Sequence, residues 1–369
     1  MYQIFINIMR VFALVLAFVG QLPATAESFI PRSSHGMTAF VPRGGDQQTV
    51  NQMTQESHIE PVYAAKTVSS FDKYNKEHAE SIKNPAKYWG KLAKEYLDWE
   101  TPFDAHRVLQ GDLTKGDVRW FSGGKLNVAF NALDRHDPNK LAMIWEGDEP
   151  DDVRRITYGE LTNKVSQIAN ALKAKGVKKG QVVTIYMPMI PELAMTMLAC
   201  ARIGAVHSVV FAGFSSEALG SRIQAANSET LVTADHGVRG SKRIPLKDIA
   251  DAALEHVQDK DLVKNVLVWE RDFQGMESDA PYEMNDKDVR MDILVADQRP
   301  YCPPEPMEAE DNLFILYTSG STGMPKGLVH TTGGYALYAA HTCKTTFDLV
   351  STLTIDWILK LWKQKLANP

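Results

Sequence analysis

Hydrophobic positions recur with two different periods through the central part of the chain. Short apolar runs with the length and composition of buried strands stand at 141–145, 154–157, 182–187, 206–211, 231–233, 266–269 and 313–317. Between several of these runs, apolar residues return every three or four positions, as on the buried face of a helix. Strands that alternate with helices predict an α/β fold, in which parallel sheets are flanked by helices.

The helices of this region carry recognisable end signals. Thr157 and Glu160 form the pattern of a capping box, and Gly176 suits the end of the helix that they begin. The buried stripe of that helix is expected at Leu161, Val165, Ile168 and Leu172. Pro191 is expected to begin the next helix, and Gly204 to close it.

Upstream of this region, order is expected to begin near Phe71. Asn84 and Pro85 have the pattern of an N-cap and a first-turn proline. One face of the helix that follows is predicted to pack in the core through Tyr88, Trp89, Leu92, Ala93 and Tyr96. Residues 99–131 contain one Pro and four Gly and are expected to be mainly loop, and the charged residues 270–300 are expected to form an irregular surface excursion.

The candidate chemistry lies in residues 313–330, LFILYTSGSTGMPKGLVH. An expected buried strand leads into six small residues, and a second apolar run begins at Leu328. Glycines let the backbone approach a ligand closely, successive N–H groups in such a turn favour an anion, and Lys326 adds a positive charge. The stretch therefore predicts a loop that holds phosphate groups through Thr318, Ser319, Gly320, Ser321, Thr322, Gly323 and Lys326.

Two other interpretations of this stretch are weaker. A flexible Ser/Gly linker has this composition, but linkers are not normally placed between two buried apolar runs. The stretch is also not a Walker motif, because Gly320 is not followed five residues later by Gly-Lys.

The loop and the His330–Tyr335 segment after it resemble the adenylate-forming acyl-CoA ligases, and most closely the AMP-forming acetyl-CoA synthetases. The similarity runs from about Tyr88 to Asp348 and includes the segment Gly123–Val128. It implies the N-terminal half of the large domain of such an enzyme, with an incomplete sheet. It also implies ATP, Mg²⁺ and coenzyme A as cofactors, and acetate as the substrate that attacks the α-phosphate of ATP.

The resemblance also assigns roles to residues. Lys326 is implied to stabilise the leaving pyrophosphate electrostatically. The family's contacts to the nucleotide part of coenzyme A correspond to Arg239, Gly240, Ser241 and Lys242. From the residues alone, a solvated loop is the better interpretation of this basic segment. Lys242 stands where bacterial relatives commonly carry Arg, so that a bidentate phosphate contact is not implied there.

Several other polar or sulfur-containing residues are interpreted as structural. His207 lies inside an apolar run and is expected to be a core histidine. The methionines Met187, Met189, Met195 and Met197 are expected to pack in the core, and no metal site is predicted. Asp235 and His236 adjoin the basic segment, but the sequence does not show that they act as acid and base.

Composition and charge narrow the class of protein. The chain has 369 residues, of which 44% are hydrophobic and 23% charged, values ordinary for a globular protein. A net charge of -5 provides no basic excess for nucleic acid. The resemblance implies instead the small molecules acetate, ATP and coenzyme A as partners. The cysteines Cys200, Cys302 and Cys343 form neither a disulfide framework nor a zinc spacing.

The N-terminus has the pattern of a targeting segment. Residues 1–26 contain Arg10, the apolar run Val11–Val19 and the small residues Ala24–Ala26, as in a signal peptide, and the run is too short to predict a membrane span in the mature chain. Residues 27–70 are expected to be a disordered leader, in which residues 28–45 carry Arg32 and Arg43 and no acid, as in a transit peptide. Organellar targeting, for instance to a plastid, and a misassigned start with translation from Met37 or Met53 in the cytoplasm both fit this pattern.

The expected organisation continues with an acetyl-CoA synthetase N-terminal region at 71–140, a partial AMP-binding domain at 141–348 and an unrelated tail at 349–369. In the tail, Ile355, Ile358, Leu359, Trp362 and Leu366 share one face of a basic amphipathic helix pattern. A frameshift or truncated gene would also produce such a tail.

The expected function is therefore that of an AMP-forming acetate–CoA ligase, with this polypeptide expected to be an inactive fragment. A ligase for propionate or another short acid, and a non-catalytic module that binds nucleotide phosphates or a partner, are the alternatives.

Overall fold

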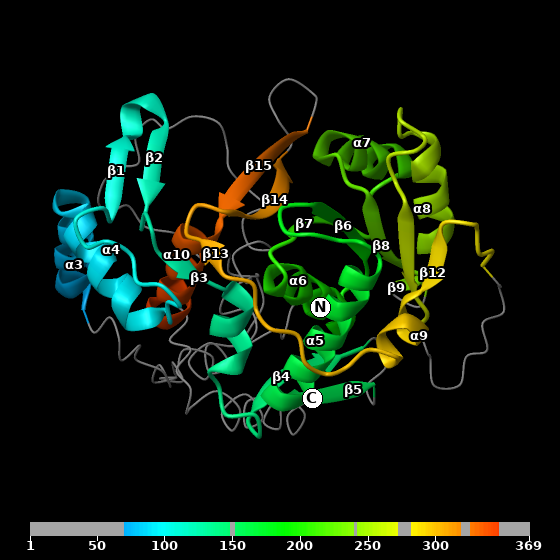
Figure 1. Cartoon of the computed structure of the whole chain (residues 1–369), viewed down its shortest axis with the longest axis horizontal. Coiled ribbons are helices and arrows are strands. Elements are labelled where there is room, and N and C mark those ends of the chain that lie inside the picture. The colour runs from blue at the N-terminus through cyan, green and yellow to red at the C-terminus, as the bar shows by residue number, and fades with distance from the viewer. Residues whose placement is uncertain (1–69, 148–151, 240–241, 272–281, 319–324, 347–369) are drawn as a thin grey trace, which may run out of the picture.

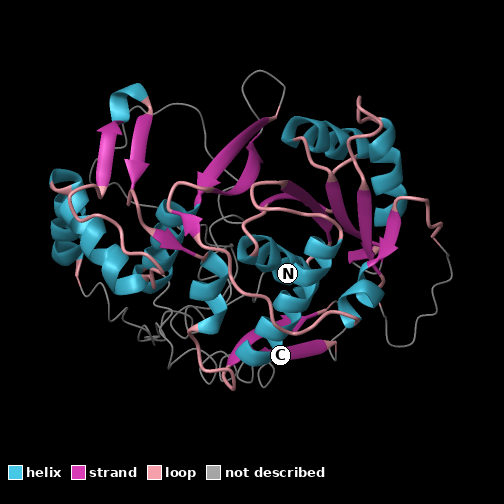
Figure 2. Cartoon of the chain, in the orientation of Figure 1, coloured by secondary structure: helices cyan, strands magenta, loops and turns pink. Residues whose placement is uncertain are grey.

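The computed structural model describes residues 70–147, 152–239, 242–271, 282–318 and 325–346. One sheet runs through this part of the chain (Figures 1 and 2). Its strands are β6 (Val182–Met187), β7 (Val206–Phe211), β8 (Thr230–Ala234), β11 (Asn265–Trp269), β12 (Asp288–Arg290), β14 (Asn312–Thr318) and β15 (Lys326–Thr331). They lie in the order β12-β11-β8-β6-β7-β14-β15, and every neighbouring pair is parallel except β14 and β15.

Helices cover both faces of this sheet because the chain changes direction along it. From β6 the chain passes through α6 (Pro191–Arg202) to β7, and it then returns through α7 (Ser216–Ala226) to β8 on the far side of β6. Right-handed crossovers in opposite directions place their helices on opposite faces. Accordingly, α5 (Tyr158–Ala174) packs with α6, and α8 (Leu246–Glu255) packs with α7 (Figure 1).

The elements predicted from periodicity and end signals are confirmed. The predicted ranges of β6 and β7 agree with the structure, and the runs at 141–145 and 154–157 form an antiparallel hairpin of β4 (Leu141–Glu146) and β5 (Val153–Thr157). The Thr157–Glu160 capping box is present, and the predicted stripe of α5 is fully buried. Gly176 and Gly204 have φ values of +85° and +71°, as expected for glycines that end helices.

The prediction for residues 270–300 is wrong in the described part after 281. There, β12 extends the sheet, and α9 (Met291–Ala296) buries Met291 and Val295. The charged composition concealed β12 because the charge of its Asp288 is buried in an ion pair. Lys247 Nζ on α8 lies 2.8 Å from Asp288 Oδ2 on β12, and both side chains are at most 1% exposed.

The second apolar run of the phosphate-loop stretch is not buried, contrary to the prediction. It forms β15, an edge strand in which Leu328 and Val329 are 50% and 51% exposed. The strand is antiparallel to β14 because so short a connection allows only a hairpin, whereas a parallel pair needs a long crossover. Among the methionines, Met189 is likewise exposed rather than packed in the core.

The N-terminal region lies beside the edge of the sheet that carries β15 (Figure 1). It contains α3 (Phe71–Lys83), α4 (Pro85–Tyr96), the hairpin of β1 (Leu109–Asp112) and β2 (Asp117–Trp120), and β3 (Lys125–Leu126), which pairs with β13 (Met307–Glu308). The prediction of mainly loop at 99–131 missed the hairpin, and α3 was not predicted. Asn84 precedes α4 as expected, but its side-chain amide donates to Glu80 instead of capping the helix.

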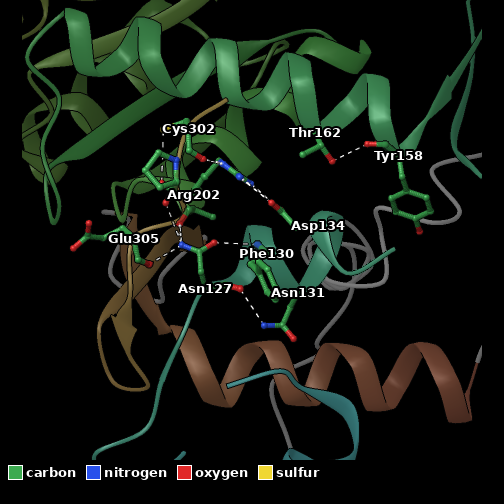
Figure 3. A network of polar contacts seen from close by, with 11 residues as sticks. Asn127, Phe130, Asn131, Asp134, Tyr158, Thr162, Arg202, Cys302 and Glu305 are labelled. Carbon is green, nitrogen blue, oxygen red and sulfur yellow. Dashed lines mark hydrogen bonds and ion pairs between the residues drawn. The ribbon is translucent and has the colours of Figure 1, made fainter. Parts of the chain in front are cut away.

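A buried polar network joins this region to the sheet (Figure 3). The side-chain amide of Asn127 donates to the carbonyl oxygens of Ala201, Arg202 and Glu305 at 2.9, 3.1 and 2.8 Å. The guanidinium of Arg202, 1% exposed, donates to both carboxylate oxygens of Asp134 at 2.8 and 2.9 Å. Since these partners come from the N-terminal region, from α6 and from the segment before β13, the network fixes three distant segments together.

Some predictions fall outside the described residues. These are the signal peptide at 1–26, nearly all of the leader at 27–70 and the tail at 349–369. Across the ranges that are described, no helix combines the length and the apolar character that crossing a membrane requires.

Candidate functional site at the carboxyl edge of the sheet

The carboxyl ends of β6, β7, β8 and β14 lie along one edge of the sheet, where open α/β sheets bind their ligands. The predicted phosphate loop leaves this edge. Thr318 ends β14 and Lys326 begins β15, and the two residues are paired directly opposite each other with exposed side chains. Ser319, Gly320, Ser321, Thr322 and Gly323 lie outside the described residues. The structure thus brings together the two ends of the predicted loop.

Close packing holds the stem of the loop. Tyr317 of β14 pairs with Gly327 of β15, the residue that follows Lys326. A Cβ atom at Gly327 would lie 3.0 Å from Ile315 Cγ2 and 3.1 Å from Tyr317 Cε1, so glycine allows the tyrosine ring to lie against β15. Burial raises the pKa of the Tyr317 hydroxyl, and nearby Arg222 opposes that rise. The Tyr317 hydroxyl therefore remains a neutral hydrogen-bond donor at physiological pH.

The turn between β7 and α7 lies beside this stem. The Tyr186 hydroxyl donates to the Phe214 carbonyl oxygen at 2.9 Å, and Ser215 caps α7 by accepting from the Ala218 amide. Phe214 is 38% exposed. Sequence analysis did not select Tyr186, Phe214 or Tyr317 as residues of the site. Tyr186 and Tyr317 were concealed within apolar strand patterns, although a tyrosine at the carboxyl end of a buried strand is a usable signal because its hydroxyl needs a partner.

The basic segment forms a hairpin rather than an irregular loop. β9 (Gly237–Arg239) pairs with β10 (Lys242–Ile244), and Arg239 stands opposite Lys242. The Lys242 side chain is exposed, whereas Gly240, Ser241 and the side chain of Arg239 lie outside the description. This hairpin follows β8, three strand positions from β14, which corresponds to roughly 14 Å across the sheet. The structure therefore places the two predicted anion sites along the same edge but apart.

Asp235 and His236 anchor the start of that hairpin. Both are buried, with Asp235 Oδ2 2.8 Å from His236 Nδ1. The other carboxylate oxygen accepts from the backbone amides of His236 and Arg271 at 2.7 and 3.2 Å. Burial, together with Asp235 and two further carboxylates, raises the pKa of Tyr282 to about 12. A carboxylate engaged in this way orders a turn, which explains these residues without an acid–base role.

The chemistry of the edge fits anionic groups better than it fits a metal cage. Lys326 and Lys242 offer positive charge, and Thr318 offers a hydroxyl. No group of three or more His, Cys, Asp or Glu side chains suited to a metal ion occurs among the residues that the structure describes. The described part of this edge thus offers donors for phosphate oxygens.

Comparison with known proteins identifies two matching families. Residues 130–364 match the family described as "AMP-binding enzyme", and residues 74–132 match the one described as "Acetyl-coenzyme A synthetase N-terminus". The first match thus extends beyond Asp348.

Individual relatives give the same result. Acetyl-coenzyme A synthetase 2 of Pseudomonas aeruginosa is 50% identical over 280 residues, which are 75% of this chain and 42% of that protein. Acetyl-coenzyme A synthetase of Alcanivorax borkumensis is 49% identical over 313 residues, 82% of this chain and 47% of the relative. Acetyl-coenzyme A synthetase 2 of Saccharomyces cerevisiae is 50% identical over 285 residues, 76% of this chain and 40% of the relative. The chain spans less than half the length of these relatives.

Proposed function

Because this chain belongs to the AMP-binding enzyme family and carries an acetyl-coenzyme A synthetase N-terminus, we propose that it serves AMP-forming acetate–CoA ligation. In this reaction an acetate oxygen attacks the α-phosphorus of ATP, a P–O bond forms, and the bond to pyrophosphate breaks. The thiol sulfur of coenzyme A then attacks the acyl carbon, giving acetyl-CoA, AMP and a proton.

The observation that carries this proposal is the pairing of Thr318 with Lys326 at the carboxyl edge of the sheet. We assign the loop from Thr318 to Lys326 to the β- and γ-phosphates of ATP. Negative charge accumulates on the leaving pyrophosphate as the P–O bond breaks. A lysine and backbone amides fixed beforehand stabilise that charge without reorganisation.

We assign coenzyme A to the β9–β10 hairpin, through Arg239, Gly240, Ser241 and Lys242. The exposed cationic side chain of Lys242 suits the phosphates of its nucleotide part. The separation of this hairpin from β14 leaves ATP and coenzyme A distinct positions along one edge.

Substitution of Lys326 tests the proposal. Lys326→Ala removes a charge-assisted contact to phosphate and is expected to weaken Mg-ATP binding by about 10- to 100-fold in a calorimetric titration. Lys264→Ala is the matched control. This exposed lysine directly precedes β11, so it lies at the amino ends of the strands, away from the predicted loop. Equal affinity of Lys326→Ala and the parent chain would refute the assignment of the loop.

Acetate-dependent exchange of label between pyrophosphate and ATP distinguishes the alternatives. Our expectation that residues 1–369 alone do not catalyse adenylation stays a prediction. Acetate-dependent exchange by this polypeptide would overturn that prediction and exclude the non-catalytic alternative. A stronger signal with propionate than with acetate would indicate the other short-acid ligase.

For localisation, organellar import and a cytoplasmic product of a later start both remain proposals. N-terminal sequencing of the protein isolated from its own cells tests them. A mature N-terminus between 27 and 70 without an initiator methionine supports import, whereas one at Met37 or Met53 supports the later start.

A further inference from the structure

Arg222 on α7 occupies an unusual position beside the stem of the predicted phosphate loop. It is 9% exposed, and its guanidinium carbon lies 4.8 Å from the ring centroid of Phe214 and 5.5 Å from that of Tyr317. These rings belong to the β7–α7 turn and to the penultimate residue of β14. A planar guanidinium stacks on aromatic faces, so Arg222 bridges two elements of the carboxyl edge.

Hydrogen bonds fix this arrangement. Arg222 Nη1 donates to the Ala218 carbonyl oxygen at 2.6 Å, which holds the guanidinium against its own helix. The Tyr317 hydroxyl donates to the Arg222 carbonyl oxygen at 3.3 Å. Arg222 therefore contacts Tyr317 through its side chain and also through its main chain.

The contact continues from Tyr317 into the second strand of the stem. Tyr317 pairs with Gly327, and their close approach leaves little space for a Cβ atom. Displacement of the Tyr317 ring would therefore disturb the strand next to Lys326. Arg222, Tyr317 and Gly327 form a continuous series of contacts from α7 to the residue that follows the phosphate-binding lysine.

The charge of Arg222 also lies in a distinctive environment. In the described part of the chain, its electrostatic neighbours are aromatic rings and the Tyr317 hydroxyl rather than a carboxylate. Buried arginines that serve only stability are commonly paired with acids, as Arg202 is with Asp134. An arginine without such neutralisation contributes positive potential beside the stem.

We propose that Arg222 is a positioning residue for polyphosphate binding, which aligns the β14–β15 stem by holding Tyr317 between α7 and Gly327. The inference rests on the proposed function of the loop. It predicts that Arg222 influences phosphate affinity through Tyr317, without touching the phosphate.

The test uses the full chain and inorganic tripolyphosphate with Mg²⁺, titrated calorimetrically. Arg222→Met keeps the length of the side chain but loses its charge and planarity, and it is expected to weaken tripolyphosphate binding about tenfold, in the range of coupling between neighbouring residues. Arg222→Lys keeps only the charge and is expected to recover part of the affinity. Tyr317→Phe keeps the ring but loses the hydroxyl, and it is expected to weaken binding about two- to threefold.

Arg154→Met is the matched control. Arg154 also lies over an aromatic ring, at 5.1 Å from the ring of Trp145, but it holds the β4–β5 hairpin against α6 and does not contact the stem. Its substitution is expected to leave tripolyphosphate affinity unchanged. Amide hydrogen exchange provides a second measurement, in which Arg222→Met is expected to speed exchange in β14 and β15 while strands β8 and β11 keep their protection.

The outcomes separate this inference from the proposed function. If Lys326→Ala weakens tripolyphosphate binding but Arg222→Met and Tyr317→Phe do not, the phosphate loop stands and the role of Arg222 is refuted. If neither the parent chain nor any variant binds tripolyphosphate, the proposed function fails, and this inference fails with it. If Arg222→Met does not fold, the affinities of Arg222→Lys and Tyr317→Phe decide, and parental values for both refute the inference.

Discussion

At the scale of single residues, burial alters the acid–base behaviour of a histidine in the sheet. His207 on β7 is 1% exposed, and its ring stacks on Phe314 with centroids 5.5 Å apart. The sequence predicted a core histidine, and its burial confirms this. Burial lowers the pKa of His207 from 6.5 to about 3, because a charged ring is poorly solvated there.

This pKa makes folding stability dependent on pH in a defined direction. Below pH 6.5 the unfolded chain binds a proton at His207 that the folded chain does not bind, so stability falls as pH falls from about 6.5 towards 3. Between pH 7 and pH 4 the loss from this residue is about 3 kcal/mol. His207→Leu is expected to remove that part of the pH dependence in urea unfolding measured at several pH values.

The slope that remains in the variant comes in part from His330 and His341, whose pKa values burial also lowers. Identical pH dependence in the parent chain and in His207→Leu would contradict the assignment.

At the scale of elements, the sequence revealed those whose signals are local. The Thr157–Glu160 capping box, the Pro191 start and the Gly204 end depend on residues within one or two helical turns, and each was predicted correctly. The strand β12 was not predicted because the burial of its Asp288 depends on an ion pair with Lys247, a residue of α8. The loop between two apolar runs was predicted, but the pairing of Thr318 with Lys326 and the exposure of β15 were not, since both depend on how the strands are placed and covered.

The contact between α4 and α10 (Thr332–Thr345) provides a test at this scale. The His341 ring on α10 lies among aromatic rings of α4, with centroids 5.5 Å from Trp89 and 6.1 Å from Tyr96. Trp89→Ala removes the largest of these rings and is expected to lower the free energy of unfolding by about 2 kcal/mol. Hydrogen exchange should increase first in α3 and α4.

Phe71→Ala is the control, since Phe71 is an aromatic residue of α3, which packs against α4, but is 76% exposed. Its effect should stay within about 0.5 kcal/mol. Equal losses in the free energy of unfolding for the two variants would show that the α4–α10 contact does not hold α3 and α4 in place.

At the scale of the whole molecule, the network around Asn127 and Arg202 joins the N-terminal region to the sheet (Figure 3). Asn127 is 6% exposed and satisfies carbonyl groups from segments that are far apart in the sequence. Cooperative unfolding requires such connections, because regions without shared buried contacts open separately.

Asn127→Ala is therefore expected to lower the free energy of unfolding by about 2 kcal/mol or more, since buried carbonyl oxygens lose their donors. Because the network joins the two regions, calorimetry of the parent should show one transition, and the variant should show that transition at lower temperature. Asn139→Ala at an exposed position is the control. An unchanged transition in Asn127→Ala, or separate transitions in the parent, would contradict this view of the network.

The sequence by itself determined the class of fold, the strands and helices of the central sheet that carry local signals, and the position of the phosphate-loop stretch after a buried strand. These features follow from periodicity, caps and turn residues, which act over a few neighbouring positions. Tertiary structure alone decided that Lys247 meets Asp288, that Asn127 joins three segments, and that Arg222 lies between Phe214 and Tyr317. Such contacts depend on how distant segments are placed together, because a buried charge or amide is stable only where the fold brings a partner to it.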